Sequence, residues 1–169
     1  TLYALERARM QTAGAGSDLE EAASPAVIDL PGGGRVLVFG LGESSSGIPG
    51  RWAADEGRSG GFLLEDLPDR TARRLTALRD RFARPGDLCI ASIHWGGNWG
   101  YEVPPEQQGF ARALIDEAGF HLVHGHSSHH VKAFEIHRGR LILYGCGDFL
   151  NDYEGIGGYG AYRGDLSLM

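Results

Sequence analysis

The sequence of 169 residues predicts a single α/β domain spanning residues 1–169, on three observations. Residues 88–93 form an almost continuous apolar run, which is typical of a strand buried on both faces of a sheet. Residues 105–119 place their apolar side chains on one side of a helix. A second short apolar segment, residues 120–125, follows that helix. Strand and helix therefore alternate, as in layered α/β proteins, and no linker or internal repeat divides the chain.

The N-terminal segment predicts two helices. Apolar residues between Leu2 and Met10 have helical spacing, and Gly14 is the expected end of this helix. Ser17 is the expected N-cap of a second, short helix, with Glu20 as its reciprocal partner.

The remaining elements follow from turn residues and hydrophobic patterns. The predicted elements are strands over residues 26–30 and 36–41, a long surface loop over 42–61, a helix over 68–84 and a hairpin over 133–145. The hairpin is expected to turn at Arg138 and Gly139.

Composition excludes some functional classes. The net charge is −6 and no basic run occurs, so a nucleic-acid partner is not expected. No apolar run approaches the roughly 18 residues that a membrane span needs. Cys89 and Cys146 lie in apolar, strand-like runs and are predicted to be buried thiols, which favours a cytoplasmic location.

Histidines gather where two predicted strands end. His124, His126, His129 and His130 fall within seven residues, and His94 ends the strand over residues 88–93. Ligands of α/β proteins bind beyond the carboxyl ends of strands, so these two loops can meet over one site. Imidazole is the commonest metal ligand in proteins. We therefore expect His94, His126 and His129 to bind a divalent transition metal, with manganese, iron and zinc as candidates.

The other histidines have open assignments. A metal with a free coordination position acidifies bound water, and a spare histidine, His124 or His130, could act as general acid for the leaving group. His124 lies within the predicted strand and could face away from the cluster. Of the adjacent pair His129 and His130, only one is expected to face the site. A core histidine bonded to a backbone carbonyl is the alternative for each.

A site with two metals usually needs a bridging carboxylate. Asp148 and Asp152 follow the last predicted strand and are the candidates, with solvated loop carboxylates as the alternative. Glu43 in the glycine-serine loop is a weaker candidate. Trp95 flanks the first histidine, where packing over the strand end is favoured over a wall for an organic substrate.

Three ordered motifs resemble the CapA or PgsA family of bacterial capsule and poly-gamma-glutamate synthesis proteins, and the resemblance covers nearly all of the chain. The family's His-Trp-Gly, Gly-His-x-x-His and Gly-Asn/Asp-Phe motifs fall on His94, Trp95 and Gly96, on Gly125, His126 and His129, and on Gly147, Asp148 and Phe149. Many relatives have a glutamate soon after the first motif, where this chain has Asn98 and Trp99.

The family is similar to the calcineurin-like metallophosphoesterases. The resemblance implies a layered α-β-β-α sandwich of two mixed sheets, with one or two metal ions at the strand ends of the complete protein. The Gly-Asp, Asn-x-Glu and Asn-Asn-His motifs of the family's N-terminal half do not occur in this chain. We therefore expect the chain to correspond to the C-terminal half of the family's domain. We expect the chain alone to be inactive, and to have an exposed sheet edge through which a homodimer could form.

The resemblance also implies a function in capsule or poly-gamma-glutamate biosynthesis. The expected activity is metal-dependent hydrolysis of a polyanionic or phosphorylated substrate. The alternative is a non-catalytic component that binds the polymer or a partner in a synthesis and export complex at the membrane. Relatives can be anchored in the membrane through an N-terminal segment, so an extracellular, anchored location is the alternative to the cytoplasm.

Overall fold

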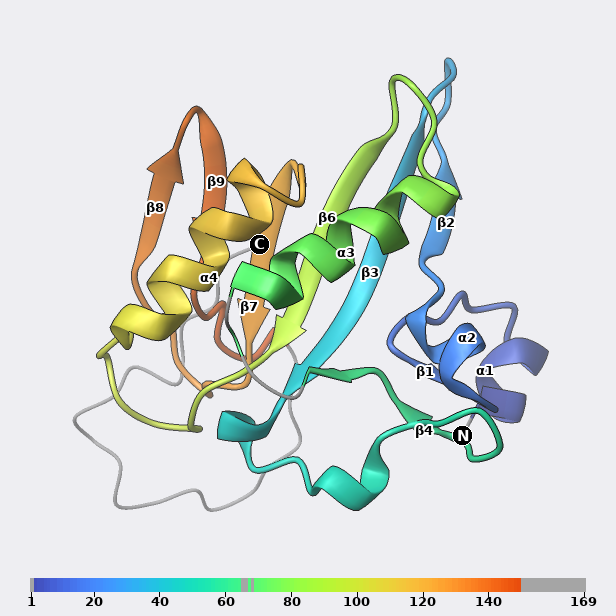
Figure 1. Ribbon diagram of the computed structural model, residues 1–169, viewed down its shortest axis with the longest axis horizontal. Coiled ribbons are helices and arrows are strands. Elements are labelled where there is room, and N and C mark those ends of the chain that lie inside the picture. The colour runs from blue at the N-terminus through green and yellow to red at the C-terminus, as the bar shows by residue number, and fades with distance from the viewer. Residues whose placement is uncertain (1, 65–66, 68, 150–169) are drawn as a thin grey trace.

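The computed structural model describes residues 2–64, 67 and 69–149, and its main feature is one mixed β-sheet (Figure 1). Within these residues the sheet has seven strands in the order β2-β3-β6-β7-β9-β8, with β5 paired to β3. The strands are β2 Ala26–Asp29, β3 Arg35–Glu43, β5 Leu63–Leu64, β6 Leu88–His94, β7 Leu122–His126, β8 Phe134–His137 and β9 Arg140–Leu143. Strands β3, β6, β7 and β9 run parallel, whereas β2 and β8 are antiparallel strands at the ends of this order.

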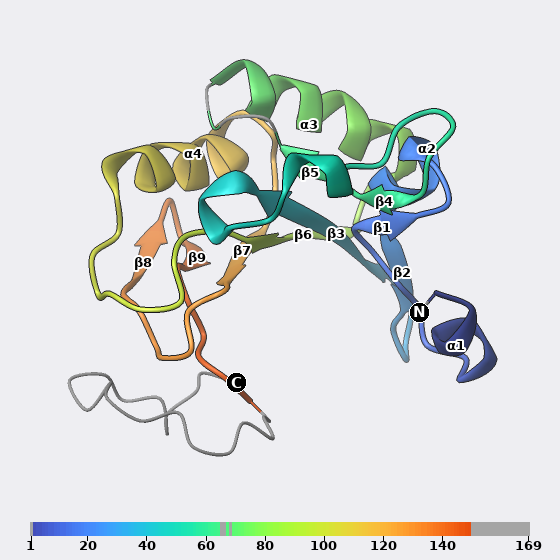
Figure 2. The same cartoon turned by 90° about the horizontal axis from the view of Figure 1, so that it is seen from below.

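Most of the described helices cover one face of this sheet, and the first helix lies outside that layer, near the N-terminus (Figure 2). The helices are α1 Leu2–Arg7, α2 Leu19–Ala23, α3 Asp69–Phe82 and α4 Pro105–Asp116, and 3-10 turns form at Ser44–Ser46 and Gly50–Trp52. A separate pair of short strands, β1 Ala15–Gly16 and β4 Gly60–Gly61, lies beside α2. None of the helices in the described ranges combines the length and apolar character that a membrane crossing requires.

The core lies between the sheet and the helices α3 and α4. Alternate strand residues point into it, among them Phe39 and Ile93, and α4 contributes Phe110 and Leu114. The Phe39 ring meets the Phe120 ring edge-on, at 5.4 Å between centroids. Each such side chain contributes about 1.5–3 kcal/mol when buried, so this helical layer holds the sheet in place.

The opposite face of the sheet carries apolar side chains that the described residues leave uncovered by a helix. Ile28, Leu88, Phe134 and Ile136 project from this face and are 45%, 46%, 62% and 63% exposed. Parallel sheets are normally covered on both faces. The predicted α/β class is therefore confirmed, and one sheet with one helical layer is a partial sandwich.

The first helix is shorter than predicted. It ends at Arg7, and Arg9 has the left-handed φ of 56°, so Gly14 does not end it. Gly14 instead lies against Gly40 of β3: a Cβ atom at Gly14 would stand 2.9 Å from the carbonyl carbon of Gly40. This glycine therefore serves close packing of two backbones.

The cap of α2 is one residue later than predicted. Asp18 is the N-cap and accepts a hydrogen bond of 2.9 Å from the backbone N–H of Glu21. The Ser17 backbone N–H and hydroxyl both donate to the Glu21 carboxylate, at 2.7 and 2.5 Å. The reciprocal arrangement exists, but Glu21 rather than Glu20 completes it.

The other predicted elements agree with the structure, with small shifts at their ends. Strand β3 continues two residues beyond the predicted end, to Glu43, and the long loop contains the two 3-10 turns and β4. Cys89 and Cys146 are buried free thiols, as predicted.

Candidate metal site

Two histidines meet at the carboxyl ends of β6 and β7. His94 and His126 are direct partners in the register of these parallel strands, and their Nδ1 atoms are 3.1 Å apart. The backbone N–H of Trp95 donates to the carbonyl of His126 at 3.0 Å, which ties the two loops together just beyond the strands. The structure thus brings together the two strand ends that the sequence predicts to be neighbours.

The separation of these two nitrogen atoms suits metal binding. Zinc–imidazole bonds measure about 2.0–2.1 Å. Two such bonds at angles between a right angle and the tetrahedral angle place their nitrogens about 2.9–3.4 Å apart. The observed 3.1 Å falls in that interval, and it also suits a hydrogen bond between one protonated and one unprotonated ring nitrogen.

His124 belongs to the same row of side chains. It precedes His126 by two residues in β7, so both project from the face of the sheet that lacks helices, and their ring centroids are 5.4 Å apart. Ser92, the register partner of His124 on β6, has its hydroxyl 3.1 Å from the His124 Nδ1 atom. His124 therefore does not face away from the cluster, which the sequence left open.

Burial keeps this row of imidazoles uncharged. Burial, together with smaller contributions from the nearby His94 and His124 rings, lowers the pKa of His126 to about 4. Burial also lowers the pKa of His94, with a smaller contribution from the charge of His129, and it lowers the pKa of His124. Neutral imidazole offers the lone pair that a metal ion needs.

Gly125 allows β7 to pass close to its neighbours between these two histidines. A Cβ atom there would stand 2.6 Å from both the carbonyl oxygen of Leu143 and the indole Nε1 of Trp95. The Trp95 ring is buried, stacks on Tyr144 at 6.1 Å and donates from Nε1 to the Tyr144 carbonyl at 3.1 Å. Trp95 is therefore a packing residue that supports the strand ends.

His129 lies in a separate pair with Asp148. Its Nδ1 atom is 2.9 and 3.2 Å from the two carboxylate oxygens of Asp148, and both side chains are about one-fifth exposed. The backbone N–H of His129 donates to the carbonyl of Asn98 at 3.0 Å, so Asn98 positions the histidine loop through its backbone. A carboxylate on one ring nitrogen orients the other nitrogen for a ligand.

His130 is a core residue in this arrangement. Its ring is completely buried, stacks on Trp99 at 6.0 Å and meets the edge of Tyr101 at 4.6 Å. Its Nδ1 atom lies 3.0 Å from the Val131 carbonyl. His129 and His130 thus face different surroundings, as expected of adjacent residues.

The three predicted metal ligands do not form one cluster in the structure. Among residues 2–64, 67 and 69–149, no group of three or more His, Cys, Asp or Glu side chains is arranged to hold a metal ion. The structure shows two pairs instead, His94 with His126 and His129 with Asp148. Asp152 lies outside the described residues.

Two further polar residues lie at these strand ends. Ser92 was not singled out from the sequence, although its position two residues before His94 places it on the same face. Glu43, the weaker carboxylate candidate, ends β3, which lies beside the strand of His94. Its carboxylate is buried and accepts from the Ser45 N–H at 3.1 Å and the Ser44 hydroxyl at 2.9 Å, so it caps the following turn.

A cavity of about 460 Å³ adjoins the histidine pair. Its lining includes Ile48, Trp52, Phe62, Ser92, His94 and His126. The lining residues include no lysine or arginine within the described part of the chain. The cavity therefore offers apolar walls and neutral imidazoles.

Comparison with known proteins adds the family. The family model described as "Bacterial capsule synthesis protein PGA_cap" matches residues 1–153. Probable polyglutamine synthesis accessory proteins from two strains of Mycobacterium tuberculosis are 46% identical over 172 residues, covering 100% of this chain and 44% of theirs. The capsule biosynthesis protein CapA of Bacillus anthracis is 26% identical over 152 residues, covering 90% of this chain and 35% of its own length.

A shorter match gives the same relationship. The PGA biosynthesis protein CapA of Bacillus subtilis is 32% identical over 66 residues, or 39% of this chain and 17% of its own length. The chain thus spans less than half the length of these relatives. Since the family model covers most of the sequence, the resemblance noted there is confirmed, and the chain belongs to the bacterial capsule synthesis protein family PGA_cap.

Proposed function

We propose that this chain carries the histidine side of a divalent-metal site in a protein of capsule or poly-glutamate biosynthesis. The family match and the names of the relatives support the biological process. The observation that carries the metal site is the 3.1 Å separation between the Nδ1 atoms of His94 and His126 at two neighbouring strand ends. A metal-dependent hydrolase acting on a polyanionic or phosphorylated substrate is the activity that this arrangement supports best.

The residues present fit a transition metal by their chemistry. His94 and His126 would hold the ion through neutral imidazole, and His129, oriented by Asp148, is the candidate for a further ligand. When bound, such an ion supplies Lewis-acid activation of water and of a phosphoryl or carbonyl oxygen. The family's longer members have room for additional ligands outside the region that this chain matches.

His124 is the candidate for proton transfer. The Ser92 hydroxyl occupies its Nδ1 atom, which leaves Nε2 to exchange a proton with a bound substrate. Because burial lowers its pKa, the resting imidazole is neutral and accepts a proton first. His124 would then act as general base in the resting state, rather than as the general acid expected from the sequence. The complete burial of His130 supports a packing role for that residue.

Metal binding tests this proposal. We expect calorimetric titration with Mn²⁺, Zn²⁺ and Co²⁺ to show binding that His94→Ala and His126→Ala each weaken at least tenfold, with loss of the Co²⁺ visible spectrum. His137→Ala is the matched control, because His137 lies on β8, outside the histidine row, and pairs with Asp116 at the end of α4. Binding that is unchanged in His126→Ala would contradict the proposal.

A second candidate function is a non-catalytic component that binds the polymer. The absence of a cluster of three or more metal ligands among the described residues favours it, since two ligands alone hold an ion weakly. The two functions differ in turnover. The complete protein with added Mn²⁺ should hydrolyse a generic phosphodiester if it is a hydrolase, and this activity should disappear in His126→Ala. Metal-dependent binding of poly-glutamate without turnover would favour the second function.

A further inference from the structure

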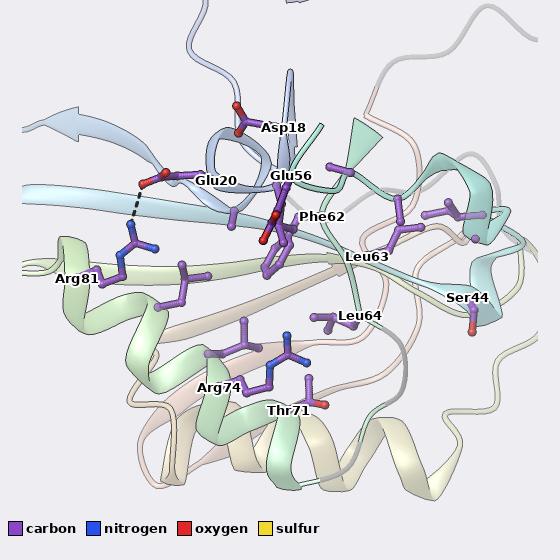
Figure 3. Close-up of a pocket in the computed structure, with 18 residues that line it drawn as sticks. Asp18, Glu20, Ser44, Glu56, Phe62, Leu63, Leu64, Thr71, Arg74 and Arg81 are labelled. Atoms are coloured by element: carbon purple, nitrogen blue, oxygen red, sulfur yellow. Dashed lines mark hydrogen bonds and ion pairs between the residues drawn. The ribbon is translucent and has the colours of Figure 1, made fainter. Parts of the chain in front are cut away.

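A second, larger cavity lies on the helix-covered side of the molecule, between α2, the 44–64 segment and α3 (Figure 3). Its volume is about 960 Å³, and ligand sites typically measure about 300–1,000 Å³. Much of its wall is apolar, with Leu19, Phe62, Leu64, Leu75 and Leu78 among the lining residues. The proposed metal site makes no use of this cavity.

Five charged side chains surround the cavity, and three of them already have partners. Asp18 caps α2 by accepting from the Glu21 N–H. Glu20 and Arg81 form an ion pair of 2.9 Å, drawn as a dashed line at one end of the cavity in Figure 3. These contacts fix the wall, and they leave Arg74 and Glu56 for a ligand.

Arg74 and Glu56 project toward the cavity from different walls. Figure 3 shows the Arg74 guanidinium extending from α3 and the Glu56 carboxylate extending from the 44–64 segment beside Phe62. Neither makes an ion pair or hydrogen bond with another residue of the described ranges. A positive and a negative group thus stand over one apolar surface, without contacting each other.

This charge pattern restricts the ligand. A simple anion would approach three carboxylates, Asp18, Glu20 and Glu56, and a simple cation would approach two guanidinium groups. A molecule with both charges and an apolar body complements Arg74, Glu56 and the leucine-rich wall at the same time. We propose that this cavity binds an apolar amino acid or short apolar peptide with free ends, its carboxylate on Arg74 and its ammonium group on Glu56.

The test uses leucyl-leucine as the probe and two capped forms as chemical controls. N-acetyl-leucyl-leucine lacks the ammonium group, and leucyl-leucine amide lacks the carboxylate. We expect calorimetry to show that the free dipeptide binds most tightly and that each cap weakens binding roughly fivefold or more, because each removes a charge-assisted hydrogen bond.

Two variants test which side chain binds which end of the dipeptide. Arg74→Gln should weaken the free dipeptide and abolish the difference between the free and amidated forms. Glu56→Gln should abolish the difference between the free and acetylated forms. Arg73→Gln is the matched control on α3, because Arg73 pairs with Glu117 at 3.6 Å and does not line the cavity.

Three results would overturn the inference. They are no binding of the free dipeptide at millimolar concentration, equal binding of all three peptides, and equal effects of Arg73→Gln and Arg74→Gln. The outcome is independent of the metal site, because none of the variants alters a histidine. Circular dichroism of each variant confirms that its fold is intact, which these exposed positions permit.

Discussion

Gly125→Ala is the substitution whose cost follows most directly from the structure. The added Cβ would stand 2.6 Å from the Leu143 carbonyl oxygen, 2.6 Å from the Trp95 Nε1 atom and 2.8 Å from the Tyr144 carbonyl oxygen. Two of these atoms belong to backbone, and the third to a buried ring, so none can move away cheaply. Overpacking of this kind typically costs about 1–3 kcal/mol.

Gly125→Ala should also break the hydrogen bond between the Trp95 indole and the Tyr144 carbonyl. The Trp95 indole donates to the Tyr144 carbonyl at 3.1 Å, and both atoms border the new methyl group. Losing this bond costs about 1 kcal/mol. The free energy of unfolding should therefore fall by about 2–4 kcal/mol. For a chain of this size the melting temperature should fall by about 4–16 °C.

Thermal and urea unfolding followed by circular dichroism measure this effect. Gly109→Ala is the control, because Gly109 lies within α4 and a Cβ atom there meets nothing within 4 Å. Alanine is favoured over glycine in a helix by about 1 kcal/mol, so the control should be more stable than the wild type. A Gly125→Ala variant that unfolds at the wild-type temperature would refute the close packing inferred at the histidine strand.

Three further predictions concern the charge of His126, the exposed face of the sheet and the cap of α2. His126 has a pKa of about 4 in the folded chain, below its ordinary 6.5, so the unfolded chain takes up the proton first and stability falls as the pH drops. Between pH 7 and pH 5, His126 should contribute a loss of about 2 kcal/mol in urea unfolding. The loss should be smaller by about that amount in His126→Gln, where His94 and His124, whose pKa values burial also lowers, still contribute. Phe134→Lys should reduce self-association at high concentration in sedimentation velocity, whereas Tyr3→Lys, at a position exposed outside the sheet, should not. Asp18→Ala should cost about 1 kcal/mol in urea unfolding and more than Ser17→Ala, since Asp18 is the cap.

Much of the fold follows from patterns that are visible in the sequence. The apolar run of β6 and the helical spacing of apolar residues in α4 predict a buried strand packed against an amphipathic helix. In the structure, side chains of both elements belong to the same core. The meeting of His94 and His126 followed from the same reasoning, because parallel neighbours end at the same edge of a sheet. The alternation of side chains also predicts that His124 shares a face with His126, because residues two apart in a strand point to the same side.

Other features depend on long-range contacts that no local pattern contains. Ser17 and Asp18 are both residue types that cap helices well, so the sequence alone does not decide which of them caps α2. The Leu19 N–H donates to the Asp55 carbonyl at 2.9 Å, and this tertiary contact fixes where α2 begins. His129 reaches Asp148 through a loop in which Ser127 has the unusual φ of 138°. Such a conformation is rare for serine, so residue spacing alone did not separate His129 from the other two histidines.

The uncovered face of the sheet links assembly to chemistry. His94, His124 and His126 project from the same face as the exposed Phe134 and Ile136. Any layer that covers the apolar side chains also closes over the imidazoles, excludes water from them and lowers the local dielectric constant. Electrostatic interactions among the imidazoles and any bound group would become stronger once this face is covered. In the proposed metal-dependent hydrolase, covering this face would therefore strengthen the interactions at the site, whereas a face open to water would keep them weak.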